Sequence, residues 1–260
     1  MQGWSRAGLW MFAVGIVGLG LTAILAIDVV LGLEPLASEV PGRRLIGFAS
    51  GLFLVAAGVC LLVGRTRRRA ALAVGWFLAI WILVLHIPHL VNHPRDGGGW
   101  TTAFEVLALG GAAWVLASLA GATTLRPVSV DPGVLGRWWY GVSLPVFGIL
   151  HFVYAVYVAS VIPAWIPAHT AWAYGTGLAH AAAGLAIVSG VKRRLAALLE
   201  GWMFAIWVVI LHAPRVATAA AERSRNEWTS LLIALAMAGG AWLIVGASTP
   251  SVREKRAAFG

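Results

Sequence analysis

Charged residues are scarce in this chain of 260 residues. They make up 11% of it, whereas soluble domains carry about 25%. Hydrophobic residues make up 60%, and the mean hydropathy is +0.85. So few charges cannot cover a 27.4 kDa globule with a polar surface, which excludes an ordinary cytosolic enzyme, a disordered chain and a fibrous repeat. We therefore expect an integral membrane protein whose main partner is the lipid bilayer.

Cysteine is nearly absent as well. The single residue, Cys60, excludes an internal disulfide framework and a Cys-x-x-Cys metal or redox site. Acidic residues are few, so the net charge is +9. The bases occur as short groups between apolar runs, a pattern typical of membrane topology. We therefore predict no nucleic-acid partner.

Long apolar runs dominate what is present. A bilayer core about 30 Å thick requires about 20 apolar residues per helix. The first run is too long for the apolar part of a signal peptide, so we interpret it as a retained helix. Eight runs qualify, near residues 7–31, 45–63, 70–91, 101–122, 138–162, 171–191, 195–218 and 228–247.

The bases are distributed unevenly between alternate loops. Thirteen of the nineteen lie at Arg6 and within 65–69, 126–137, 192–194 and 253–256, and the other loops share six. Because cytoplasmic loops carry an excess of Lys and Arg, we expect both termini in the cytoplasm.

The chain also contains an internal repeat. Gly75-Trp76-Phe77-Leu78-Ala79-Ile80-Trp81 recurs as Gly201-Trp202-Met203-Phe204-Ala205-Ile206-Trp207, and Leu85-His86-Ile87-Pro88 recurs as Leu211-His212-Ala213-Pro214. Four helices per copy give both copies the same orientation. We therefore predict an all-α membrane protein with eight transmembrane helices in two parallel four-helix bundles, residues 1–125 and 126–260.

All seven histidines fall in the outer half of a predicted helix or at the outer surface. His151, His180 and His212 lie at a similar depth in the second half. Ionisable groups in a membrane are costly and usually face the bundle interior or a cavity. We predict that His151, Tyr154, His180 and His212 converge in one catalytic site. An alternative remains open, in which each imidazole makes one interhelical hydrogen bond worth about 0.6 kcal/mol.

Two prolines follow the repeated histidines. Pro88 and Pro214 each remove a backbone donor and clash with the carbonyl four residues earlier. Either a kink beside the imidazole or the end of the helix would satisfy this constraint, and the sequence leaves both open.

Aromatic residues accumulate around the link between the fifth and sixth helices. The uncharged segment 163–167 contains two prolines, and we expect it to cover the site. Trp165, Trp172 and Tyr174 are the predicted ligand-contacting residues. Glu227, at the outer end of the eighth helix, is predicted to carry protons to the surface.

Residues 138–247 contain further segments that point to a known family. These are His151-Phe152, Ile162-Pro163-Ala164-Trp165-Ile166-Pro167, Trp172-x-Tyr174-x-x-Gly177 with Gly184, and Leu211-His212-Ala213-Pro214. This half resembles the DoxX family of small four-helix bacterial membrane proteins. The first half matches only through the repeat, with Leu21 where His151 is expected and Ser50 in place of His180. The resemblance implies the bacterial inner membrane and a redox association, since relatives include the membrane subunit of a thiosulfate:quinone oxidoreductase.

Three functions remain open at this point. In the first, the site binds a quinone and works with other membrane or periplasmic redox subunits. In the second, the histidines ligate haem, copper or zinc, although no repeated ligand spacing supports this and we assign no metal ligand. In the third, the protein is a non-catalytic scaffold subunit or a small-solute transporter.

Overall fold

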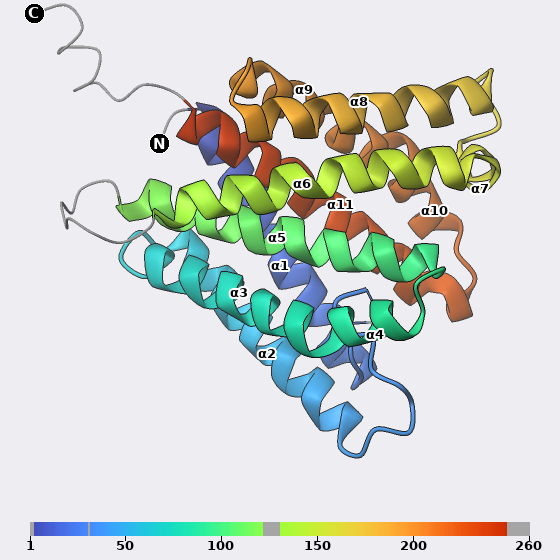
Figure 1. The fold of residues 1–260 in the computed structure, drawn as a ribbon. Helices are drawn as coiled ribbons and strands as arrows, with labels where there is room; N and C mark the ends of the chain where they lie inside the picture. The colour runs from blue at the N-terminus through green and yellow to red at the C-terminus, as the bar shows by residue number, and fades with distance from the viewer. Residues whose placement is uncertain (1–2, 31, 122–130, 249–260) are drawn as a thin grey trace, which may run out of the picture.

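The computed structural model describes residues 3–30, 32–121 and 131–248, and these residues form an all-helical protein (Figure 1). Seven helices in this part are long and apolar enough to cross a membrane, and an eighth span results if one bent pair is counted. The helices of the first half are α1 (Gly3–Ala26), α2 (Arg43–Leu62), α3 (Arg67–Trp81), α4 (Ile87–Asn92) and α5 (Gly97–Gly121). Those of the second half are α6 (Pro132–Val153), α7 (Ala155–Val161), α8 (His169–Ser189), α9 (Arg193–Trp207), α10 (Ala213–Thr218) and α11 (Ala221–Ala247).

The two Leu-His-x-Pro segments neither end their helices nor leave them regular. A π-helical turn, η1 (Ile82–His86), joins α3 to α4, and η2 (Val208–His212) joins α9 to α10. In each, the N–H just before the proline donates to the carbonyl five residues earlier, from Ile87 to Ile82 and from Ala213 to Val208. The wider turn relieves the clash between the proline ring and the preceding turn. Of the two alternatives that the sequence left open, the end of the helix is therefore excluded, and a local distortion beside each imidazole is found.

The fifth predicted helix is broken. α6 and α7 meet at a bend of 92°, where Tyr154 leaves the helical conformation. The Tyr154 hydroxyl donates to the carbonyl of Arg95 in the first half, at 3.3 Å. This hydrogen bond links the two halves at the point where the helix is interrupted. The pattern of apolar residues does not predict the bend.

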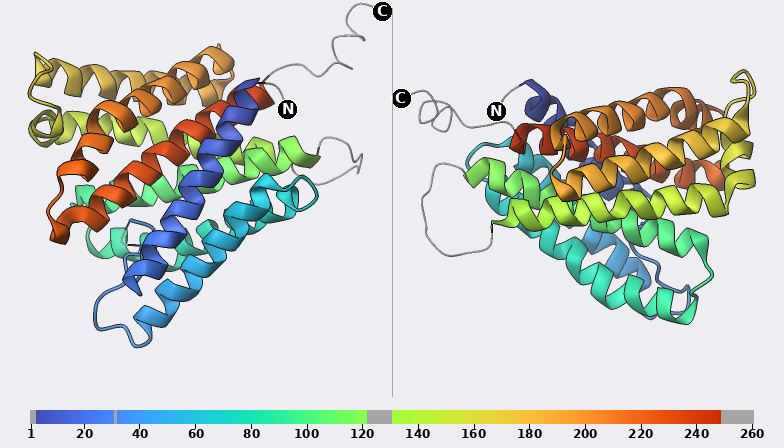
Figure 2. Two further views of the ribbon diagram at one scale, coloured as in Figure 1. Left: turned by 180° about the vertical axis from the view of Figure 1, so that it is seen from behind. Right: turned by 45° about the horizontal axis from the view of Figure 1, so that its top comes forward.

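The two halves repeat the same packing. α1 packs on α2, α2 on α3 and α3 on α5, as α6 packs on α8, α8 on α9 and α9 on α11. The first helix of each half also packs on the last helix of the other, and α5 lies against α11 (Figure 2). The halves therefore share one apolar core. The predicted boundary at residue 125 lies outside the described residues.

Tryptophan and glycine contacts confirm the duplication at atomic detail. Trp76 stacks edge-on against Trp114 with ring centroids 5.3 Å apart, and Trp202 packs on Trp242 at the same distance. Gly75 and Gly201 sit against these two indoles, where a side chain would collide. The repeated Gly-Trp pairs thus serve close helix packing.

The helix ends form two faces. The start of α1 and the end of α11 lie together, because Ser5 contacts Gly246. The α2–α3 and α8–α9 links lie at this same end, at the left of Figure 1. We call this the base-rich end, since it carries Arg65, Lys192 and their basic neighbours. The distal end carries α4, α7 and α10 and the described residues 27–30 and 32–42; α7 and α10 lie at the right of Figure 1, and the link before α2 lies towards its bottom.

Candidate functional site

A buried pair of hydrogen-bonded side chains lies in the middle of the second half. The His180 Nδ1 atom on α8 lies 2.7 Å from the Glu200 Oε1 atom on α9, and the two side chains are only 7% and 1% exposed. The rings of Phe147 and Phe204 flank the imidazole at 6.1 and 5.4 Å. A carboxylate in such apolar surroundings requires a partner, and His180 provides it.

A second imidazole adjoins this pair. The His151 ring on α6 meets the His180 ring edge-on, with centroids 5.1 Å apart. Gly177 on α8 makes this approach possible, because a Cβ atom there would lie 2.8 Å from the His151 Cβ atom. His151 and His180 are therefore in contact, as expected from their equal predicted depth.

The hydrogen bonds determine what each imidazole offers. His151 Nδ1 lies 2.8 Å from the Phe147 carbonyl oxygen, which can only accept, so Nδ1 carries the proton. The Nε2 atom of neutral His151 is then a proton acceptor. The Glu200 carboxylate likewise accepts the Nδ1 proton of His180. His180 and Glu200 form a dyad. Together with the adjacent His151 they make up what we call the dyad site, which is suited to accept a proton.

The other two residues predicted to be catalytic contact different partners. Tyr154 is held at the distal end by the Arg95 carbonyl. His212 lies in η2, and its Nδ1 atom is buried without a hydrogen-bond partner. Glu227 forms a two-point ion pair with Arg215, with both N–O distances at 2.8 Å. Convergence of all four predicted catalytic residues remains a prediction. The proton-carrying role of Glu227 also remains a prediction, and its carboxylate is paired with Arg215.

The predicted aromatic residues lie on the outside of the second half. Trp165, Trp172 and Tyr174 are exposed, and in a membrane-spanning region such a surface contacts lipid. Tyr174 stacks on Phe152, the neighbour of His151, at 5.4 Å. Ile166 is buried, so the 162–168 link does fold against the distal end of the bundle.

Glu200 was not among the predicted site residues. It precedes the repeated Gly201-Trp202, so its equivalent in the first half is Val74. The equivalent of His180 is Ser50, so the first half lacks both members of the dyad. A single acid within an apolar run is costly in a membrane, and this signal would have identified Glu200.

No metal cluster marks the site in the part of the chain that the structure describes. Within residues 3–30, 32–121 and 131–248, no group of three or more His, Cys, Asp or Glu side chains is placed to hold a metal ion. Two surface hollows, of about 300 and 630 Å³, lie near Arg6 and Arg43, and none of the predicted site residues lines them.

Comparison with known protein families gives one match, which lies in the second half. The model of a family described as a domain of unknown function (DUF8561) matches residues 141–249, less than half of the chain. No curated protein and no solved structure matches the chain significantly. The matched region contains the whole dyad site, but the family description assigns no activity. The resemblance to DoxX stays a prediction.

Proposed function

We propose that the second half binds a quinol headgroup from the lipid phase and takes up its proton at the dyad site. The observation that carries the proposal is the buried pair of His180 and Glu200 in contact with a second imidazole, at ring distance 5.1 Å. Such a pair is expensive to maintain among apolar helices. Proton transfer in the membrane gives it a purpose that simple helix packing does not require.

The chemistry follows from the free lone pair of His151. A quinol hydroxyl would donate to the His151 Nε2 atom. On oxidation, the quinol loses two electrons to a redox centre of a partner subunit and releases two protons, one to His151 and the other to water at the membrane surface. His151 accepts one proton and can pass it to the adjacent His180, where the Glu200 carboxylate stabilises the positive charge.

Access from the bilayer supports this function. His151 is half-buried and Phe152 beside it is exposed. Phe152 and Tyr174 offer stacked aromatic faces to a quinol ring, and exposed Trp172 extends this surface. The resemblance to a family with quinone-linked relatives agrees with the same class of ligand.

Binding of a short-chain benzoquinol to the protein in lipid nanodiscs tests the proposal. We expect His151→Ala to weaken binding about tenfold, because one hydrogen bond of about 1.4 kcal/mol is lost. His89→Ala is the matched control, since His89 lies in the first half and pairs with Asp96. Binding that is unaffected by His151→Ala, or absent from the wild-type protein, would contradict the proposal and favour a scaffold role.

We also propose the orientation given by the bases, with the base-rich end in the cytoplasm of a bacterial inner membrane. Cysteine labelling in a Cys60→Ser background checks this. Arg65 and Arg95 are exposed at opposite ends. A membrane-impermeant maleimide added to intact cells should label Arg95→Cys and leave Arg65→Cys unlabelled. The reverse pattern would overturn the orientation.

A further inference from the structure

The link between α1 and α2 enters the bundle instead of lying on its surface. Val29, Val30 and Leu33 are fully buried. We call the described residues 29, 30 and 32–36 the inserted segment. Gly47 on α2 faces the backbone at the start of this segment, and Gly32 lies against Ile233 on α11. The Leu33 carbonyl accepts the Nε2–H of buried His86 on η1, at 3.0 Å.

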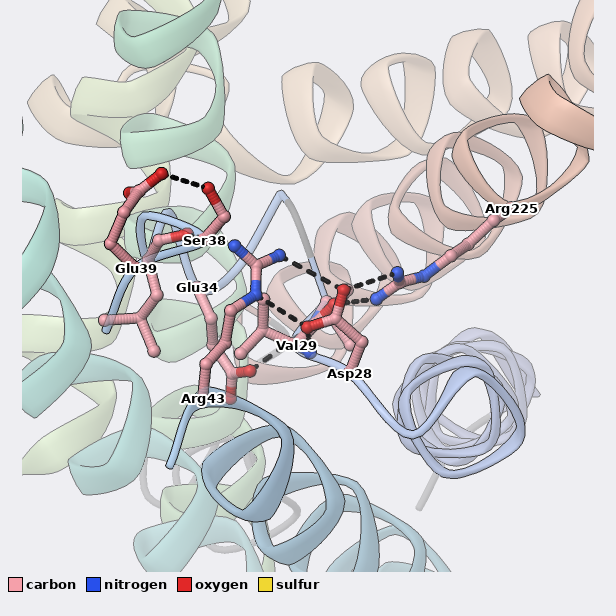
Figure 3. A network of polar contacts seen from close by, with 9 residues as sticks. Asp28, Val29, Glu34, Ser38, Glu39, Arg43 and Arg225 are labelled. Carbon is pink, nitrogen blue, oxygen red and sulfur yellow. Dashed lines mark hydrogen bonds and ion pairs between the residues drawn. The ribbon is translucent and has the colours of Figure 1, made fainter. Parts of the chain in front are cut away.

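Both ends of the inserted segment are anchored by charges. Asp28, just before it, pairs with Arg43 of α2 and Arg225 of α11 at 2.7 and 3.1 Å (Figure 3). Arg225 also donates to the Val29 carbonyl, and Arg43 donates to the Leu36 carbonyl at 2.6 Å. The hydrogen bond from Arg43, with help from Arg225, holds the pKa of Asp28 well below its usual range.

Between these anchors lies a carboxyl group without a cation. Glu34 is 0% exposed, and its Oε2 atom accepts the Val30 N–H at 3.3 Å. Among the described residues its Oε1 atom has no hydrogen-bond partner. Both nearby guanidinium groups face Asp28 instead (Figure 3). An ionised carboxylate buried in this way would carry a large desolvation cost.

Ser50 on α2 is a polar neighbour of the Glu34 carboxyl group. Its hydroxyl lies close enough to act on the pKa of Glu34, and its only proton is donated to the Ile46 carbonyl at 2.5 Å. Ser50 is the counterpart of His180, so the same helix position adjoins a buried glutamate in both halves.

We propose that Glu34 is a proton-binding group of the first half, buried as the neutral acid, and that loss of its proton releases the inserted segment from the bundle. The groups that surround it are Asp28 in the same link, Arg43 and Ser50 on α2, His86 on η1 and Arg225 on α11. Both arginines are engaged by Asp28, and His86 binds the Leu33 carbonyl in its neutral form. Ionisation of Glu34 thus adds a negative charge that no neighbour is placed to neutralise.

The expected pH dependence follows from the two states of the carboxyl group. Burial raises the pKa of Glu34 from 4.5 to about 7, partly offset by Ser50 and the Val30 N–H. In a released, hydrated segment the pKa returns to its ordinary value. The closed state is therefore favoured below pH 4.5, and the opening equilibrium rises about tenfold per pH unit up to pH 7, then levels off. The total change is about 300-fold.

Hydrogen exchange of the inserted segment in nanodiscs measures this opening between pH 4.5 and 8.5, after correction for intrinsic exchange rates. Wild-type protection should fall about 150-fold over this range, because half of the open-state carboxyl groups are already ionised at pH 4.5. Glu34→Gln, which cannot ionise, should keep a flat profile. Glu39→Gln is the matched control, because Glu39 lies in the same link but is exposed, and it should follow the wild type. A flat wild-type profile, or an unchanged slope in Glu34→Gln, would overturn the proposal.

A measurement on the wild-type chain covers the case in which Glu34→Gln does not fold. Dicyclohexylcarbodiimide adds to protonated carboxyl groups in apolar surroundings, and mass spectrometry of peptides locates the adduct. We expect an adduct at Glu34 that forms more readily at pH 5.5 than at pH 8.5, relative to exposed Glu39. No preference for acid pH at Glu34 would contradict the proposal. Neither experiment depends on quinol binding.

Discussion

Replacing His180 with leucine is expected to destabilise the protein by about 3–5 kcal/mol. The change removes the only side-chain partner found for the Glu200 carboxylate, which is 1% exposed. The cost is that of an uncompensated buried charge, and it exceeds the modest value of the hydrogen bond itself. Denaturant unfolding in detergent micelles or nanodiscs measures the loss.

The double variant His180→Leu, Glu200→Leu separates charge from packing. Two apolar side chains of similar volume remove both polar partners together, so we expect most of the lost stability to return. The first half shows that this fold tolerates the absence of the pair, because Ser50 and Val74 occupy the equivalent positions. If the double variant is as unstable as the sum of the single variants, the two residues are not coupled. A folded double variant that no longer takes up protons would also support the dyad site.

The class of the protein could be predicted because composition and run length are direct consequences of the lipid environment. The duplication was equally accessible, since Gly75-Trp76 and Gly201-Trp202 make the same contacts in the structure. The packing of the first helix of each half on the last helix of the other half, α1 on α11 and α6 on α5, could not be predicted. Hydropathy gives the length of a helix but leaves its rotation and its partners undetermined.

The candidate site was predictable only where depth alone brings residues together. His151 and His180 meet because they lie at similar depth on neighbouring helices. Apolar periodicity gave no sign of the bend between α6 and α7, beside which the Tyr154 hydroxyl donates to the Arg95 carbonyl of the first half. The burial of Glu34 could not be predicted from the sequence. An irregular link has no hydrophobic periodicity that would indicate that it enters the bundle.

A large packing effect is expected from adding a single methyl group where the two halves meet. In Gly111→Ala, the new Cβ atom would lie 2.5 Å from the Gly136 carbonyl oxygen and 2.9 Å from the Tyr140 nitrogen, both backbone atoms of α6. Backbone cannot move aside as a flexible side chain does, so α5 and α6 must separate. We expect a loss of about 1–3 kcal/mol, seen as a lower Tm.

The duplication supplies the controls for this experiment. Gly239 on α11 is the counterpart of Gly111, and a Cβ atom there would lie 2.5 Å from the Phe12 nitrogen of α1. Gly239→Ala should therefore cost about as much as Gly111→Ala. Gly175→Ala should not, because no atom lies within 4 Å of its Cβ position and alanine favours a helix over glycine by about 1 kcal/mol. If Gly111→Ala were as stable as Gly175→Ala, the close contact between the halves would not be what holds them together.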